Sequence, residues 1–115
     1  MSPSSTPTTS SQRITETFSG TVSVLGCGTN NFTVNQSGEL DVTLTSASPP
    51  PNVVMQLGVG TQLGATCSLI STMNTAAGPA STLGGQAAPG AFCVSVCDAG
   101  NQTGTVNYTV SVVHP

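Results

Sequence analysis

The segment GELDVTLT, residues 38–45, alternates polar and apolar side chains without interruption. In an extended strand successive side chains point to opposite faces, so Leu40, Val42 and Leu44 share one face and the polar residues share the other. A strand with one apolar and one polar face is typical of an antiparallel sheet that packs one side on a core. The segment therefore predicts a sheet with one wet face, as in a β-sandwich.

The same alternation returns near the end of the chain. Phe92, Val94 and Val96 form a second apolar face. A third apolar face is formed by Val106, Tyr108, Val110 and Val112. No helical periodicity persists along the sequence, and β-branched residues and glycines are frequent. These patterns predict an all-β protein.

Turn-forming residues divide the chain into about eight candidate strands. The candidates are residues 14–24, 31–34, 39–46, 53–59, 66–71, 81–86, 91–98 and 105–113. Strands of this number and length, in about 100 residues, are typical of an antiparallel β-sandwich. The stretch 72–85 has the weakest pattern, and we expect it to be a loop with one short strand.

Charged side chains are scarce: they make up 4% of the chain, against roughly 25% in typical soluble proteins. With Arg13 as its single basic side chain, the protein lacks the cations that neutralise nucleic-acid phosphates or bind an anionic membrane surface. No apolar run approaches the ~18 residues of a membrane-spanning helix. The 37% of hydrophobic residues and the net charge of −3 indicate a folded domain.

The first twelve residues differ in composition from the rest. Residues 2–11 are only Ser, Thr and Pro, and they contain neither the basic nor the apolar region of a signal peptide. Such segments commonly tether a domain to a lipid anchor or to a preceding module. We therefore expect residues 1–12 to be a tail or linker and residues 13–115 to be the sandwich domain.

Four cysteines, Cys27, Cys67, Cys93 and Cys97, permit three disulfide pairings. Cys93 and Cys97 lie on one predicted strand, which separates their Cα atoms by roughly 13 Å. A disulfide needs less than about 7 Å, so the pairing that contains a Cys93–Cys97 bond is excluded. Two pairings stay open: Cys27–Cys93 with Cys67–Cys97, and Cys27–Cys97 with Cys67–Cys93.

A zinc site is the alternative use of four cysteines. Such sites usually present their thiolates from tight C-x-x-C turns, whereas an extended strand holds Cys93 and Cys97 apart. Two structural disulfides are therefore preferred. They predict an oxidising compartment, which is extracellular, periplasmic or at the cell surface.

Several short segments follow one another along the chain in a characteristic order. They are TFSGTV (17–22), FTV (32–34), GELDVTLT (38–45), LGVG (57–60), TC (66–67), GAFCV (90–94) and VNYTV (106–110). In these segments the chain resembles the bacterial pre-peptidase C-terminal-like (PPC-like) domains, over roughly residues 16–114.

The resemblance implies a jelly-roll-like β-sandwich attached to secreted bacterial proteins. Such domains are non-catalytic and act in targeting or substrate association. Similar members carry cysteines that match Cys67 and Cys93, which implies the pairs Cys67–Cys93 and Cys27–Cys97. Cys27 and Cys97 depart from the family pattern, and the family provides no functional residues to transfer.

Residue types that serve catalysis are few and scattered. The one histidine, His114, stands next to the C-terminus, where we expect it to be solvated. Glu39 and Asp41 share a strand face and have the chemistry of an acid–base pair, but we interpret them as the wet side of an amphipathic strand. The sequence has no serine-elbow, zinc-protease or phosphate-loop motif. We therefore expect no enzyme activity.

Oxygen-bearing side chains near one turn are candidate calcium ligands. Asp98 precedes the predicted turn 99–104, Asn101 lies in it, and Asp41 is a third candidate. Turns between strands favour the same residue types without any ion, and this interpretation is preferred. We expect neither a metal nor a cofactor.

Carbohydrate binding would suit a secreted sandwich, but the usual aromatic platform is missing. The chain has no Trp, and we assign Phe18, Phe32 and Phe92 to the core. Tyr108 lies on the apolar face of its strand. The sequence thus provides no aromatic surface on which a sugar ring could stack.

Two functions follow as hypotheses. The first is a binding or targeting module of an exported bacterial protein, with an extracellular polymer or protein as its partner. The second is a structural subunit that self-assembles on a surface or in a fibre. Sheet edges are normally protected by Lys, Pro or inward charges; because this chain has no lysine and few charges, its edges are permissive to added strands.

Overall fold

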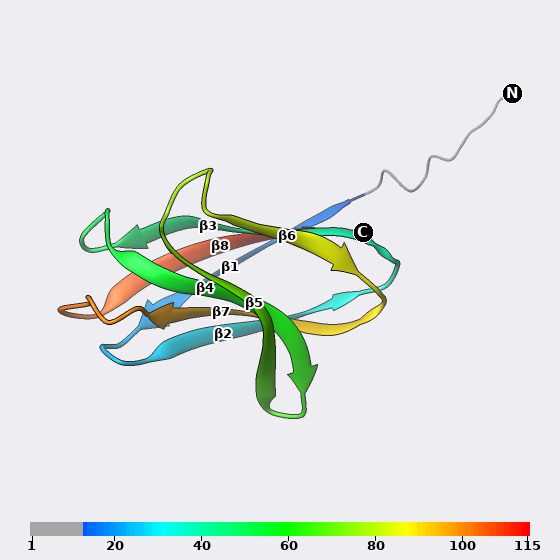
Figure 1. Cartoon of the computed structure of the whole chain (residues 1–115), viewed down its shortest axis with the longest axis horizontal. Helices are drawn as coiled ribbons and strands as arrows, with labels where there is room; N and C mark the ends of the chain where they lie inside the picture. The colour runs from blue at the N-terminus through cyan, green and yellow to red at the C-terminus, as the bar shows by residue number, and fades with distance from the viewer. Residues whose placement is uncertain (1–12) are drawn as a thin grey trace, which may run out of the picture.

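The computed structural model describes residues 13–115 (Figure 1). This part of the chain forms eight strands and no helix, so it contains no helix that could cross a membrane. The strands are β1 (Ile14–Val22), β2 (Cys27–Val34), β3 (Gly38–Ser48), β4 (Val54–Leu63), β5 (Thr66–Ala76), β6 (Thr82–Ala87), β7 (Gly90–Asp98) and β8 (Val106–His114). The expected tail, residues 1–12, lies outside the described residues.

The strands form two antiparallel four-stranded sheets, with the orders β1-β8-β3-β6 and β2-β7-β4-β5. Along the chain, β1 pairs with β8, β2 with β7, β3 with β6 and β4 with β5, as in one long hairpin. This hairpin is rolled up so that β3 also pairs with β8, and β4 with β7. Eight strands rolled in this way form a jelly roll, which confirms the predicted fold class (Figure 1).

The core lies between the two sheets and contains the three apolar faces that the alternation predicts. Leu40, Val42 and Leu44 of β3 are buried against residues of the second sheet, as are the alternate residues of β8. Fully burying one such side chain contributes about 1.5–3 kcal/mol relative to leaving it exposed. The largest fully buried side chains come from both sheets and include Leu44, Met55, Leu57, Val94 and Val110.

Two regions that the sequence predicts to be turn or loop are strand. β2 begins at Cys27 rather than at residue 31, because residues 27–30 pair with β7. Gly28 also leaves room for a core ring, since a Cβ there would lie 2.6 Å from Oη of Tyr108. Most of the stretch 72–85 belongs to β5 and β6, which pair with β4 and β3.

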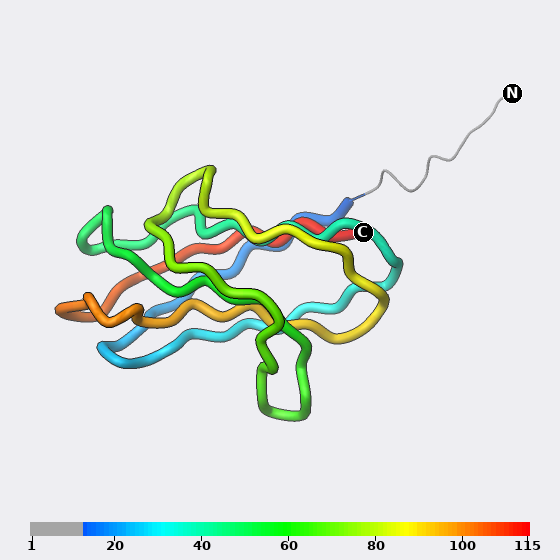
Figure 2. Tube along the Cα trace, viewed as in Figure 1, coloured from blue at the N-terminus to red at the C-terminus, as the bar shows by residue number. Residues whose placement is uncertain are grey.

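The hairpin of β4 and β5 turns away from its sheet (Figure 2). Its cause is a β-bulge: Val59 is opposite Ser71 and Gly60 is opposite Leu69, so Ile70 is an extra residue on β5. At this point the two strands approach so closely that a Cβ on Gly60 would overlap the carbonyl oxygen of Ser68. The bend lets Cys67, near the tip of the hairpin, reach β7.

Candidate functional site

Two disulfides tie the second sheet together: Cys27–Cys97 and Cys67–Cys93. Cys27 and Cys97 are directly opposite on the neighbouring strands β2 and β7, with their Cα atoms 4.0 Å apart. Cys67 of β5 reaches Cys93 of β7 although β4 lies between these strands in the sheet, because the hairpin bends. This is the pairing that the resemblance implies, and it indicates an oxidising environment.

Three loops meet at one end of the sandwich, which we call the loop end: residues 23–26, 49–53 and 99–105. The start of β1 and the end of β8 lie at the opposite end, which we call the terminal end: residues 13–16, 38–41 and 113–115 (Figure 1). The loop end therefore faces away from both points where the chain enters and leaves the domain.

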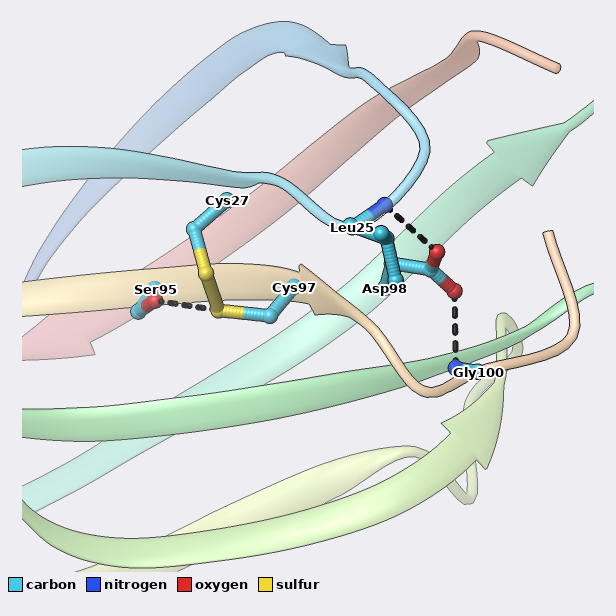
Figure 3. The surroundings of a disulfide bond; sticks show 6 residues. All are labelled: Leu25, Cys27, Ser95, Cys97, Asp98 and Gly100. Carbon is cyan, nitrogen blue, oxygen red and sulfur yellow. Dashed lines mark hydrogen bonds between the residues drawn. A yellow bond between two sulfur atoms is a disulfide. The ribbon is translucent and has the colours of Figure 1, made fainter.

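Asp98 holds two of these loops together through backbone hydrogen bonds (Figure 3). Its carboxylate accepts from the N–H of Leu25 (2.8 Å) in one loop and of Gly100 (2.8 Å) in the other. Its own N–H donates to the carbonyl of Gly26 (3.0 Å). The hydrogen bonds from Leu25 and Gly100 lower the pKa of Asp98 below its usual value, because they stabilise the carboxylate.

Asn101 and Gln102 extend these contacts to neighbouring strands. The side-chain amide of Asn101 faces the backbone of Val54, with its nitrogen 2.8 Å from the carbonyl oxygen and its oxygen 3.2 Å from the N–H. The buried Gln102 donates from Nε2 to the carbonyls of Val22 (2.5 Å) and Gly104 (2.8 Å). Together with Cys27–Cys97, these contacts fasten the loops 23–26 and 99–105 to the sandwich, the second of them at the first residue of β4.

Leu25 occupies an unfavourable backbone conformation at the tip of the loop end. Its φ is +66°, in the third position of a turn closed by the hydrogen bond from Gly26 N–H to the Ser23 carbonyl (2.8 Å). Glycine or asparagine usually takes this position, and a left-handed residue with a Cβ costs about 1–2 kcal/mol. Leu25 is 88% exposed, so burial does not offset this cost. The fold alone gives no reason for leucine here.

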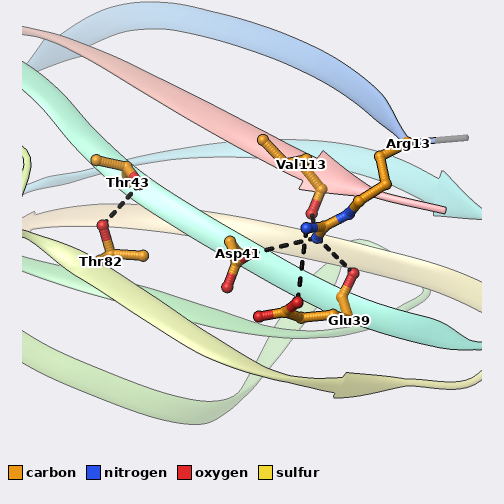
Figure 4. A network of polar contacts seen from close by, with 6 residues as sticks. All are labelled: Arg13, Glu39, Asp41, Thr43, Thr82 and Val113. Carbon is orange, nitrogen blue, oxygen red and sulfur yellow. Dashed lines mark hydrogen bonds and ion pairs between the residues drawn. The ribbon is translucent and has the colours of Figure 1, made fainter. Parts of the chain in front are cut away.

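The candidate calcium ligands are not brought together. Asp98 and Asn101 lie at the loop end, where their oxygens contact backbone N–H groups. Asp41 lies at the terminal end beside Arg13, which donates from Nη2 to Asp41 Oδ2 (3.2 Å) and to the carbonyls of Glu39 (2.8 Å) and Val113 (3.1 Å) (Figure 4). Among residues 13–115, no group of three or more His, Cys, Asp or Glu side chains is placed to hold a metal.

His114 is buried, and its prediction as a solvated terminal residue was wrong. Its side chain is 2% exposed because β8 continues to this residue and pairs it with Ile14 of β1. The ring stacks on Phe32, with centroids 5.5 Å apart, and Nε2 lies 2.6 Å from Glu16 Oε2. Proximity to the chain end was a poor signal; the alternation of β8, extended by two residues past Val112, would have placed His114 on the buried face.

Tyr108 is buried, as its place on an apolar face predicts. Its ring lies against Gly20 and Gly28, and its hydroxyl donates to Asn30 Oδ1 (2.8 Å) of the opposite sheet. Burial raises the pKa of Tyr108. The side chain therefore belongs to the core and does not form a surface for sugars.

No protein-family model matches the chain, and no curated protein matches its sequence. The likeness to PPC-like domains therefore rests on the sequence segments themselves.

Proposed function

We propose that the chain is a non-catalytic, extracellular or cell-surface binding module of an exported bacterial protein. In this proposal the loop end contacts a protein partner through Leu25 and its half-exposed neighbour Val24. The single observation that carries the proposal is the exposed leucine in a left-handed conformation, where glycine or asparagine would serve the fold better. The bacterial origin and the export rest on the resemblance to PPC-like domains and on the disulfides.

The rest of the loop end supports such a role in two ways. The hydrogen bonds of Asp98 and Asn101 hold the loops before any partner is present, which lowers the entropy lost on binding. Val24 and Leu25 are apolar, exposed and adjacent in sequence. Exposed apolar side chains surrounded by polar residues are more typical of protein-binding surfaces than of sugar or ion sites. A protein partner therefore suits this surface better than a polysaccharide.

Photo-crosslinking in the cells that produce the protein tests the proposal. A photoreactive phenylalanine is placed at Leu25 and, as the matched control, at the exposed Ser37, which lies in the loop between β2 and β3. We expect an ultraviolet-dependent adduct with a second protein from position 25 and none from position 37. Adducts of equal yield from both positions, or none from position 25, would contradict the proposal.

The substitution Leu25→Asn separates binding from folding. Asparagine tolerates a positive φ, so we expect the free energy of unfolding to rise by about 0.5 kcal/mol because strain is relieved. The same substitution should abolish binding to the partner found by crosslinking. If Leu25→Asn lowers stability and leaves binding unchanged, the leucine serves the fold and the proposal fails.

A further inference from the structure

Each sheet of the sandwich has two edge strands, and three of the four carry a recognisable protection against added strands. In the first sheet these edges are β1 and β6, and in the second they are β2 and β5. A free edge presents unpaired N–H and C=O groups that bind another strand unless charge, irregularity or short length prevents it. The four edges of this chain differ in these respects.

The protected edges use three different means. β1 carries the acidic residue Glu16, whose side chain contacts His114. The basic residue Arg13, which pairs with Asp41, lies just before the strand begins. β6 has only six residues and contains the pair Gly84 and Gly85, which weakens a strand. β5 is interrupted by the bulge at Ile70. Added strands are therefore disfavoured on all three.

β2 has none of these protections. Its eight residues, Cys27–Val34, contain no charge and no proline, and they pair with β7 in unbroken register. The hydrogen bond from Asp98 N–H to Gly26 O makes residue 26 a hydrogen-bonded partner of β7. Because partners alternate along an antiparallel ladder, the backbone groups of Thr29, Asn31 and Thr33 point away from β7. Within residues 13–115 no strand pairs with this edge.

The exposed edge of β2 is self-complementary. The residues of β2 whose backbone groups point outward are Cys27, Thr29, Asn31 and Thr33, and the last three are symmetric about Asn31. In an antiparallel pair of copies, Thr29 would lie opposite Thr33 and Asn31 opposite Asn31. Cross-strand Thr–Thr pairs stabilise a sheet, and no like charges would meet. The occupant that this edge fits is therefore a second copy of the same strand.

We propose that two copies of the chain pair through β2 in antiparallel orientation, with Asn31 on the two-fold axis. The pairing joins two four-stranded sheets into one of eight strands. Since both copies use the same edge and the other edges are protected, the assembly closes as a dimer and does not grow. This inference goes beyond the loop-end proposal and limits self-assembly to a pair, in place of a fibre.

A lysine on the axis tests the pairing. In Asn31→Lys, two ammonium groups would meet directly across the dimer, whereas the monomer keeps its fold because the exposed Asn31 makes no side-chain hydrogen bond within the described residues. The matched control is Asn74→Lys, the same change at an exposed position on β5, the opposite edge of the same sheet. Sedimentation velocity from micromolar to millimolar concentration measures the association, and circular dichroism checks the fold.

We expect the native chain and Asn74→Lys to dimerise alike, and Asn31→Lys to dimerise at least about tenfold more weakly, because opposed like charges destabilise strand pairs. Hydrogen exchange should show the amides of Thr29, Asn31 and Thr33 protected at high concentration and exposed on dilution. A native chain that stays monomeric, a dimer that Asn31→Lys leaves unchanged, or species larger than a dimer would each overturn the proposal. None of these outcomes bears on the crosslinking from Leu25.

Discussion

At the terminal end of the sandwich acidic and basic side chains contact one another, whereas at the loop end polar side chains bind backbone groups. At the terminal end Arg13 pairs with Asp41, and His114 with Glu16. At the loop end Asp98, Asn101 and Gln102 bind N–H and C=O groups of the loops, and one disulfide joins β2 to β7.

The difference follows from where the strand ladder stops. At the terminal end β1 and β8 stay paired up to Ile14 and His114, and Arg13 both pairs with Asp41 and donates to the carbonyls of Glu39 and Val113. At the loop end the chain leaves the ladder, and backbone groups that lose a strand partner need another one. Polar side chains of one loop, residues 99–105, and Asp98 before it provide these partners. A loop held in this way can keep an unfavourable residue such as Leu25 in place.

Removing the disulfides is the strongest way to test the comparison. We expect Cys27→Ala with Cys97→Ala to lower the free energy of unfolding by about 4.4 kcal/mol and Cys67→Ala with Cys93→Ala by about 3.5 kcal/mol, from sequence separations of 70 and 26 residues. Denaturant unfolding measures both.

Hydrogen exchange then shows where each double variant loosens. Without Cys27–Cys97, exchange should rise at the amides of Leu25 and Gly100, while β1 and β8 stay protected near Ile14 and His114. Without Cys67–Cys93, the increase should fall on the tip of the β4–β5 hairpin instead. If the loop end exchanges no faster without Cys27–Cys97, the hydrogen bonds of Asp98 hold it without help from the disulfide.

His114→Ala tests the terminal end and has the next largest expected effect. We expect a loss of about 2 kcal/mol, because the truncation empties a buried volume and removes the hydrogen bond to Glu16. His114→Phe, which retains a ring against Phe32, should recover part of the loss. Thermal unfolding measures both variants. A change below about 0.5 kcal/mol for the alanine variant is what a solvated residue gives, and it would contradict the buried position.

Acid should weaken the loop end through Asp98, with a smaller effect. Hydrogen bonds lower the pKa of Asp98 in the folded protein below its usual value of 3.8. The contribution of Asp98 to the free energy of unfolding is therefore fully present above pH 3.8 and is lost as the pH falls through the lower folded pKa. The melting temperature of the native chain should fall below about pH 4 more steeply than that of Asp98→Asn. Parallel curves for the two proteins, measured by calorimetry in acid, would show that these hydrogen bonds do not stabilise the carboxylate.

The faces of the strands were predictable because they depend on a period of two residues. Alternation in GELDVTLT placed Leu40, Val42 and Leu44 in the core, and β8 followed the same rule. In β7 the alternation placed Val94 and Val96 correctly, but Cys93, Ser95 and Cys97 on the other face are buried as well. The pairing of the cysteines was implied by a resemblance and is confirmed by the structure. The start of β2 was not predictable locally, because its Gly and Asn residues are typical of a turn; pairing with β7 and the ring of Tyr108 decide that they form a strand.

Only part of the candidate site could be predicted from the sequence. Asp98 and Asn101 were candidate ligands because their side chains carry oxygen, but the sequence does not tell whether these oxygens bind an ion or backbone N–H groups. Nothing near Leu25 marks it as left-handed and exposed, and the carboxylate that binds its N–H belongs to Asp98, 73 residues further along the chain. The sequence by itself determined most of the strands and the buried faces of β3 and β8, and its four cysteines indicated an oxidising setting. Tertiary structure decided which strands are neighbours, which edge stays open and which loops meet, because these depend on contacts between residues far apart in the chain.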